Sequence, residues 1–149
     1  MNTDQKSDIA LKAQHVRNQP CFSDLTSEEI DQVTELLQEI HVKAGETIVK
    51  EGEPVDSVYL IVEGQADVRH ITIQDGQPQI QSLAVLQHGM SIGLNETGFY
   101  SISGIRTATV VALTDMILFR LSVPSFNGFA LMFPHVKEVM HVFATAKGF

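Results

Sequence analysis

The fold is decided by residues 43–68, which read Lys-Ala-Gly-Glu-Thr-Ile-Val-Lys-Glu-Gly-Glu-Pro-Val-Asp-Ser-Val-Tyr-Leu-Ile-Val-Glu-Gly-Gln-Ala-Asp-Val. The glycines of this stretch stand in polar clusters typical of tight turns, at 44–46, 51–54 and 63–65. The segments between these clusters are rich in Thr, Ile, Val and Tyr, which favour β-strands. The stretch therefore predicts short strands joined by glycine-containing turns.

The same pattern continues to about residue 121. Asp75-Gly76 lies between two segments of alternating apolar and polar residues, which is a signal for a β-hairpin. Many short strands at close, even spacing indicate an antiparallel barrel or sandwich. We predict a mainly β fold, a jelly roll (double-stranded β-helix) with flanking helices. The expected strands are 47–50, 57–62, 66–73, 80–86, 106–114 and 116–121.

Helical patterns precede the strands. Thr26 and Glu29 form a capping box, and apolar residues at helical spacing follow, so we predict an amphipathic helix over 27–39. Residues 1–20 are polar with scattered apolar positions, and we expect them to form a loose helix that ends before Pro20.

The chain returns to a helical pattern after the strands. Residues 126–133 are short and apolar, and Pro134 suits the start of a last helix. An apolar stripe then extends to about residue 146. Because only part of such a stripe can pack on the barrel, we expect the last helix to form a homodimer or a partner interface. The alternative is a lid packed over the ligand pocket. The stripe consists of Val136, Val139, Met140 and Phe143.

Composition limits the class of protein. The 149 residues suffice for one domain, which we place at 21–149 behind a polar N-terminal extension at 1–20. The formal net charge of −8 argues against binding to DNA or to anionic membranes, because both need a basic surface. The polar N-terminus and short apolar runs predict neither a signal peptide nor a membrane span, and Cys21 has no second cysteine to pair with. We expect a cytoplasmic protein.

Arg106 is the most informative single residue. It leads into the apolar segment 107–113, although only 10 of the 149 residues are Lys or Arg. Residues 90–98 lie just upstream and can start one turn of helix. A helix N-terminus together with a guanidinium makes a pocket for an anion such as phosphate. An arginine at a strand end that reaches water or pairs with a carboxylate is the simpler alternative.

The block 43–68 closely resembles the first half of the cyclic nucleotide-binding domain, the family of the bacterial catabolite activator and of the regulatory subunits of cyclic-nucleotide-dependent kinases. Gly45, Gly52 and Gly64 match its turn glycines, and the similarity extends over roughly residues 22–146. In that family a short helix holds the sugar phosphate, with a Phe-Gly-Glu motif whose Glu binds the ribose and a later Arg that binds the cyclic phosphate. The resemblance implies the phosphate role for Arg106.

This chain departs from the family motif in two ways. Ile92-Gly93-Leu94 stands in place of Phe-Gly-Glu, so Leu94 occupies the position of the ribose-binding Glu. The loop up to Arg106 is also longer than in the family, and Glu96 is a candidate to replace the missing carboxylate. Loss of the bond to the ribose would cost roughly 1.5–3 kcal/mol, or tenfold to a hundredfold in affinity. Thr107 resembles members that prefer cyclic GMP, although Thr is also simply a good strand residue.

Other chemistry has little support in the sequence. The six histidines contain no His-x-His pair of the cupin type, and we expect His135 and His141 to be solvated and no metal to be bound. We expect no enzyme activity from this chain. The activator's relatives read DNA through a module after the long helix. We expect no DNA binding here because the chain stops at Phe149.

Two functions remain open. The first is a stand-alone regulatory, ligand-sensing domain in signalling that binds cyclic AMP, cyclic GMP or a similar phosphorylated small molecule. The second is a degenerate domain that serves as a protein-interaction scaffold without nucleotide, which the Leu94 substitution favours. The residues predicted to bind the ligand are Ile92, Gly93, Leu94, Asn95, Glu96, Arg106, Thr107 and Ala108.

Overall fold

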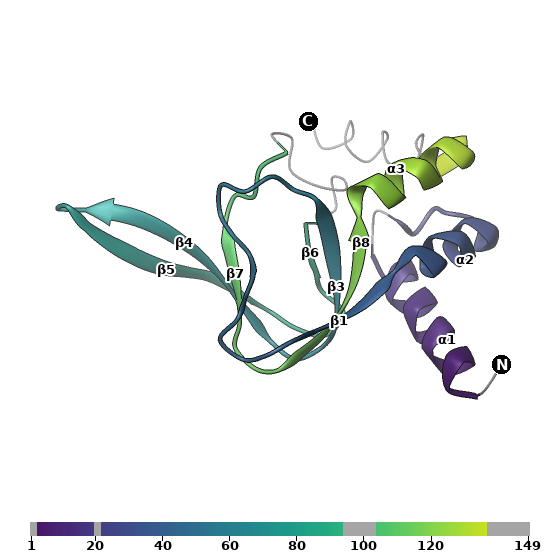
Figure 1. Ribbon diagram of the computed structural model, residues 1–149, viewed down its shortest axis with the longest axis horizontal. Helices are drawn as coiled ribbons and strands as arrows, with labels where there is room; N and C mark the ends of the chain where they lie inside the picture. Colours follow the sequence, from purple (N-terminus) through teal and green to yellow (C-terminus); the bar gives the residue numbers. More distant parts are fainter. Residues whose placement is uncertain (1–2, 20–21, 94–103, 137–149) are drawn as a thin grey trace.

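The computed structural model describes residues 3–19, 22–93 and 104–136. Within these residues, helices gather on one side of a β-barrel, and one hairpin extends away from the opposite side (Figure 1). The helices are α1 (Thr3–Arg17), α2 (Ser27–Leu36) and α3 (Val123–Met132). The strands are β1 (Gln38–Val42), β2 (Thr47–Val49), β3 (Ser57–Glu63), β4 (Ala66–Gln74), β5 (Gln77–Leu86), β6 (Ser91–Ile92), β7 (Thr109–Ala112) and β8 (Met116–Ser122).

The strands form two four-stranded antiparallel sheets, ordered β1-β8-β3-β6 and β2-β7-β4-β5. Strands distant in the sequence are neighbours, as β1 with β8 and β2 with β7. This is the crossing connectivity of a jelly roll, so the predicted fold class is confirmed.

The long apolar run in β3 is explained by burial on both faces. Val58 and Leu60 point toward the helices and join a core with Phe119 of β8. Tyr59 and Ile61 point the other way, into the core between the two sheets, which also holds Leu118 of β8. A strand buried on both faces has no polar side, and therefore reads as a continuous apolar run rather than an alternating one.

Helix α2 begins as the sequence predicts. The Thr26 hydroxyl accepts a hydrogen bond from the Glu29 backbone N–H (3.2 Å), and the Glu29 carboxylate accepts one from the Thr26 N–H (2.8 Å). The helix ends at Leu36, however, so the predicted extension to residue 39 is wrong. Leu37 is extended, and β1 follows at once because it pairs with β8 from Gln38↔Arg120 to Val42↔Met116.

Residues near both ends of the described chain are buried in the core between the helices and the barrel. Ala13 and Val16 of α1 are buried in it, so the segment set apart as an N-terminal extension packs against α2 and the barrel. Val136, the first residue of the predicted C-terminal stripe, is fully buried. Val139, Met140, Phe143 and His141 lie outside the described residues, so the interface predicted on the last helix stays a prediction.

Strands β4 and β5 form the hairpin predicted at Asp75-Gly76. Both turn residues have positive φ, 53° and 77°, and Gln74 pairs with Gln77 across them. Two consecutive residues with positive φ give a tight turn whose twist matches that of the strands. We call residues 69–83, the part of the hairpin beyond the register shift at Val68/Arg69, the hairpin arm.

Candidate functional site

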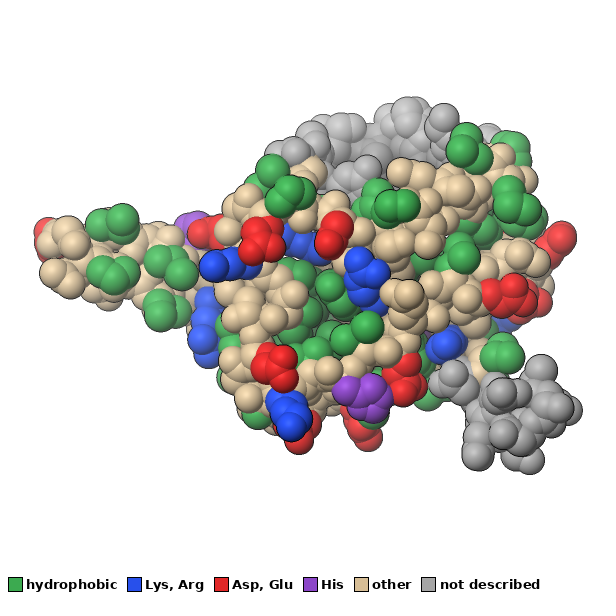
Figure 2. All heavy atoms as spheres, viewed as in Figure 1, with side chains coloured by type: hydrophobic (Ala, Val, Ile, Leu, Met, Phe, Trp, Pro, Cys, Tyr) green, Lys and Arg blue, Asp and Glu red, His purple; other side chains and the backbone are tan. Residues whose placement is uncertain are grey.

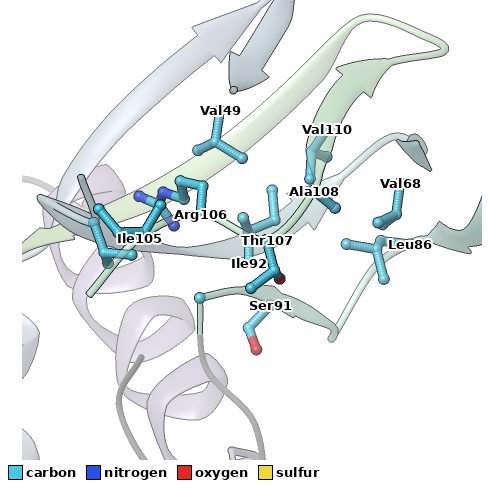
Figure 3. A pocket seen from close by; sticks show the side chains of 12 residues that line it. Val49, Val68, Leu86, Ser91, Ile92, Ile105, Arg106, Thr107, Ala108 and Val110 are labelled. Atoms are coloured by element: carbon cyan, nitrogen blue, oxygen red, sulfur yellow. The ribbon is translucent and has the colours of Figure 1, made fainter. Parts of the chain in front are cut away.

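A cavity of about 280 Å³ lies in the barrel where β6 meets the segment before β7. Its volume is at the lower end of the range for small-molecule sites. Figure 3 shows side chains from several elements converging on it. The lining residues are Val49, Val55, Val68, Leu86, Ser91, Ile92, Gly93, Ile105, Arg106, Thr107, Ala108 and Val110.

The backbone of Arg106 is hydrogen-bonded to the turn at residues 52–54. Its N–H donates to the carbonyl of Glu53 (2.8 Å), and its carbonyl accepts from the N–H of Gly52 (2.9 Å). An isolated bridge between Pro54 and Ile105 continues this pairing. The strand predicted from residue 106 therefore begins only at Thr109, because the preceding residues pair with the 52–54 turn instead of a regular strand.

The Arg106 side chain is buried, with 7% of the residue exposed. Its Nη2 donates to the backbone carbonyl of Ser57 (2.6 Å) and lies 3.6 Å from Asp56 Oδ1. The Asp56 side chain is 73% exposed and therefore screened by water, so it compensates the buried charge only weakly. Burial lowers the pKa of Arg106, and the nearby Tyr59 and Asp56 offset part of that effect. The guanidinium nevertheless remains a cation, because arginine is not deprotonated in proteins.

Gly93 makes close contact with this guanidinium. It has φ +89°, and a Cβ added there would lie 3.0 Å from Arg106 Nη1 and 3.0 Å from Val58 Cγ1. Any side chain would therefore push against the buried arginine. The lack of a side chain at position 93 lets the backbone of Gly93 lie directly beside the cation.

The remainder of the cavity is mostly apolar. In Figure 3, Val68 and Leu86 lie at the end away from Arg106, and Val110 stands near them. Among the lining residues that the structure describes, Arg106 carries the only charge, while Ser91 and Thr107 add hydroxyl groups. A site with one cation at one end and apolar walls at the other suits a ligand with an anionic group and an apolar or aromatic portion.

The comparison with known families agrees with this geometry. The family model described as the cyclic nucleotide-binding domain matches residues 39–131, which include every described lining residue of the cavity. The chain belongs to the cyclic nucleotide-binding domain family. The family and the fold are those of regulatory domains, and the absence of enzyme activity in this chain stays a prediction.

The curated relatives found by sequence are much longer than this chain. An uncharacterized NTE family protein of Mycobacterium tuberculosis is 26% identical over 125 residues, which make up 84% of this chain and 20% of that protein. The chain thus spans about a fifth of the length of the curated relatives it matches first.

Two solved structures share the fold. The N-terminal domain of a transcriptional regulator from Streptomyces coelicolor superimposes with a TM-score of 0.72 at 28% identity, over 89% of this chain and 88% of that one. The regulatory domain of Toxoplasma gondii PKA, solved with cAMP, gives a TM-score of 0.68 at 21% identity, over 87% of this chain and 46% of that one. At 21% identity this second likeness shows the fold alone.

The structure brings together five of the eight residues predicted to bind the ligand. Ile92 and Gly93 line one side of the cavity, and Arg106, Thr107 and Ala108 line another. Leu94, Asn95 and Glu96 lie outside the described residues, and a ligand-binding role for any of the eight stays a prediction.

The apolar walls of the site were not predicted from the sequence. Val68 and Leu86 come from β4 and β5, where Ala66 pairs with Leu86 and Val68 with Ala84. Alternation along these two predicted strands was the available signal, because residues 66, 68, 84 and 86 share one face. That signal cannot tell a barrel interior filled by side chains from one that leaves a cavity.

Metal and membrane sites receive no support within the described part of the chain. No group of three or more His, Cys, Asp or Glu side chains is placed to hold a metal ion there. The prediction that His135 is solvated agrees with its exposed side chain. Its side chain is 46% exposed, but its Nδ1 lies 2.8 Å from the buried Glu29 carboxylate. None of the described helices is long and apolar enough to cross a membrane.

Proposed function

We propose that this domain binds a cyclic nucleotide, or a similar phosphorylated small molecule, in the cavity beside Gly93 and Arg106. In this proposal the chain acts as a regulatory, ligand-sensing domain. The observation that carries it is the buried guanidinium of Arg106 at the cavity wall, in a chain that belongs to the cyclic nucleotide-binding domain family.

The electrostatics of Arg106 support an anionic ligand. A buried charge is costly unless it is paired, and the carboxylate nearest to the guanidinium is mostly exposed. A phosphate at the Nη1 side, next to Gly93, would compensate the cation at close range with charge-assisted hydrogen bonds. The resemblance assigns the cyclic phosphate to this same arginine.

The apolar end of the cavity supports a ligand with a base. Val68, Leu86 and Val110 offer aliphatic surface to a purine ring, which is flat and largely apolar on its faces. Cyclic AMP and cyclic GMP both satisfy this description. Thr107 lies in the lining with an exposed hydroxyl-bearing side chain, and its contact with a guanine amino group would favour cyclic GMP.

A protein-interaction scaffold without nucleotide is the second candidate. It is favoured by Leu94, which stands where the family has a carboxylate for the ribose. The hydrogen bond from Arg106 to the Ser57 carbonyl also gives the guanidinium a partner without any ligand.

A calorimetric titration with cyclic AMP, cyclic GMP and cyclic dinucleotides tests the proposal, supported by thermal shift. Ligand at 100 times its dissociation constant should add about 2.7 kcal/mol to the free energy of unfolding. The Arg106→Ala variant should lose detectable binding, because a desolvated phosphate would be left without its cation.

Arg120→Ala is the matched control. Arg120 also faces Asp56, at 4.0 Å, but it does not line the cavity, so its removal should leave ligand affinity within about twofold. If no ligand of the panel binds the unmodified chain, the scaffold function replaces the proposal. If the two arginine variants bind a ligand equally well, the ligand does not bind at Arg106 and the proposed site is wrong.

A further inference from the structure

The hairpin arm extends beyond the barrel (Figure 1). Its two faces differ in the chemistry of their side chains. The cross-strand pairs alternate between the faces, because successive residues of a strand point to opposite sides. The pairs Ile71↔Ile80 and Ile73↔Pro78 share one side, which we call the apolar face. The pairs His70↔Gln81, Thr72↔Gln79 and Gln74↔Gln77 make up the polar face.

The apolar face is open to solvent. Ile73 is 77% exposed, Ile80 is 67% exposed and Ile71 is 47% exposed. Figure 2 shows hydrophobic side chains in green along the arm, whereas Lys, Arg, Asp and Glu side chains gather mainly on the barrel and the helices. A continuous strip of large aliphatic residues on an exposed ribbon is typical of an interaction surface.

The root of the arm is anchored on both faces. On the side of the apolar face, Asp67 accepts hydrogen bonds from Arg69 Nε (2.7 Å) and from the Ser82 hydroxyl (2.5 Å). On the polar side, His70 Nδ1 contacts the Glu51 carboxylate at 2.5 Å. The arm is thus built out from a fixed base, which lowers the entropy cost of presenting its faces to a partner.

The outer edge of the arm has no charged residue. Strand β5 is the edge of its sheet, and its ten residues, Gln-Pro-Gln-Ile-Gln-Ser-Leu-Ala-Val-Leu, contain no Lys, Arg, Asp or Glu. Monomeric proteins usually protect long exposed edges with such charges. A two-stranded ribbon is also only marginally stable alone in water. Both features indicate that this hairpin is covered by another surface in the working protein.

The distribution of charge favours a second copy of this chain as the partner. The arm carries one Arg and one Asp, so its formal charge is zero and the whole net charge of −8 belongs to the rest of the chain. Two copies of an acidic protein repel each other over most contacts, and the least repulsion arises where both present a neutral surface. The apolar face meets that requirement, and a twofold axis would bring the same apolar residues of two copies together.

We propose that the apolar face of the hairpin arm is a homodimer interface, in which Ile71, Ile73 and Ile80 of one copy pack on the same residues of a second copy. The face is narrow, smaller than the roughly 800 Å² per partner of a standard interface, so the dimer is weak and concentration-dependent. The residues of this interface do not line the ligand cavity.

Sedimentation velocity and light scattering of the full chain over a range of concentrations test this interface. The unmodified chain should pass from monomer to dimer as its concentration rises. The double variant Ile73→Lys/Ile80→Lys should raise the dimer dissociation constant by at least about a hundredfold, because it places charges in the centre of the contact.

The matched control is Thr72→Lys/Gln79→Lys, which adds the same two charges to one cross-strand pair on the polar face. It should dimerise like the unmodified chain, and circular dichroism should show both variants folded because all four side chains are at least partly exposed. A monomer at every concentration overturns the proposal. Equal effects of the two double variants also overturn it, as does a dimer that only Phe143→Lys disrupts.

Discussion

Replacing Gly93 with alanine adds a single methyl group at the point where backbone and guanidinium meet. The new Cβ would lie 3.0 Å from both Arg106 Nη1 and Val58 Cγ1, closer than ordinary van der Waals contact. Both neighbours are buried, so neither can move freely into solvent. The substitution therefore displaces Arg106 without removing any of its atoms.

The expected cost has two parts. A non-glycine residue at φ +89° costs roughly 1–2 kcal/mol, because Cβ crowds the following carbonyl. The tight contact with buried atoms adds about 1–3 kcal/mol, the usual range for overpacking. Gly93→Ala should thus lower the free energy of unfolding by about 2–5 kcal/mol, and each kcal/mol lowers the Tm of a chain of this size by about 2–4 °C.

Gly45→Ala separates the two parts. Gly45 has the same φ of +89°, but a Cβ there would meet nothing within 4 Å, so only the backbone cost of about 1–2 kcal/mol remains. Urea unfolding measures both variants, and the difference between them isolates the contact with Arg106. Calorimetry with the ligand identified for the unmodified chain should show at least about tenfold weaker binding by Gly93→Ala and unchanged binding by Gly45→Ala.

The reasoning fails if Gly93→Ala is no less stable than Gly45→Ala. It also fails if Gly93→Ala binds ligand as tightly as the unmodified chain. The first result would mean that Arg106 and Val58 yield at no cost. The second would mean that the position of the guanidinium does not matter for the site.

Two further predictions concern stability. His15 is only 3% exposed, and burial, with a smaller contribution from His88, lowers its pKa. The unfolded chain then binds more protons than the folded one below about pH 6.5, so stability should fall as the pH drops through that value; His15→Phe should flatten this part of a urea-unfolding pH series, and an unchanged slope would contradict the assignment. Thr26→Ala removes one half of the capping box and should cost about 1 kcal/mol, seen as a lower urea midpoint, whereas Ser27→Ala, at the exposed next residue, should leave the midpoint nearly unchanged.

The sequence was sufficient where structure depends on short-range chemistry. The turn at Asp75-Gly76 formed as predicted because its two positive φ angles are imposed locally, by a residue pair that tolerates them. The start of α2 followed in the same way from Thr26 and Glu29, whose reciprocal bonds span three residues. The strand pattern from residue 47 onward also identified the jelly roll before any tertiary contact was known.

The sequence was insufficient where a distant partner decides the conformation. Leu37 and Ile40 continue the helical spacing of α2, yet residues 38–42 form a strand because β8 supplies hydrogen-bond partners some 80 positions later. The short strand β6 and the late start of β7 at Thr109 have the same origin, since each depends on pairing with segments far along the chain.

The same distinction between local sequence and distant partners applies to the candidate site. The sequence by itself marked Arg106, because a cation before an apolar strand is unusual enough to stand out, and the resemblance to the family marked Gly93. Only the tertiary structure decided that the guanidinium is buried against Ser57 and that Val68 and Leu86 close the far end of the cavity. Burial and cavity shape arise from the packing of strands that are neighbours in space and not in sequence, so no local pattern encodes them.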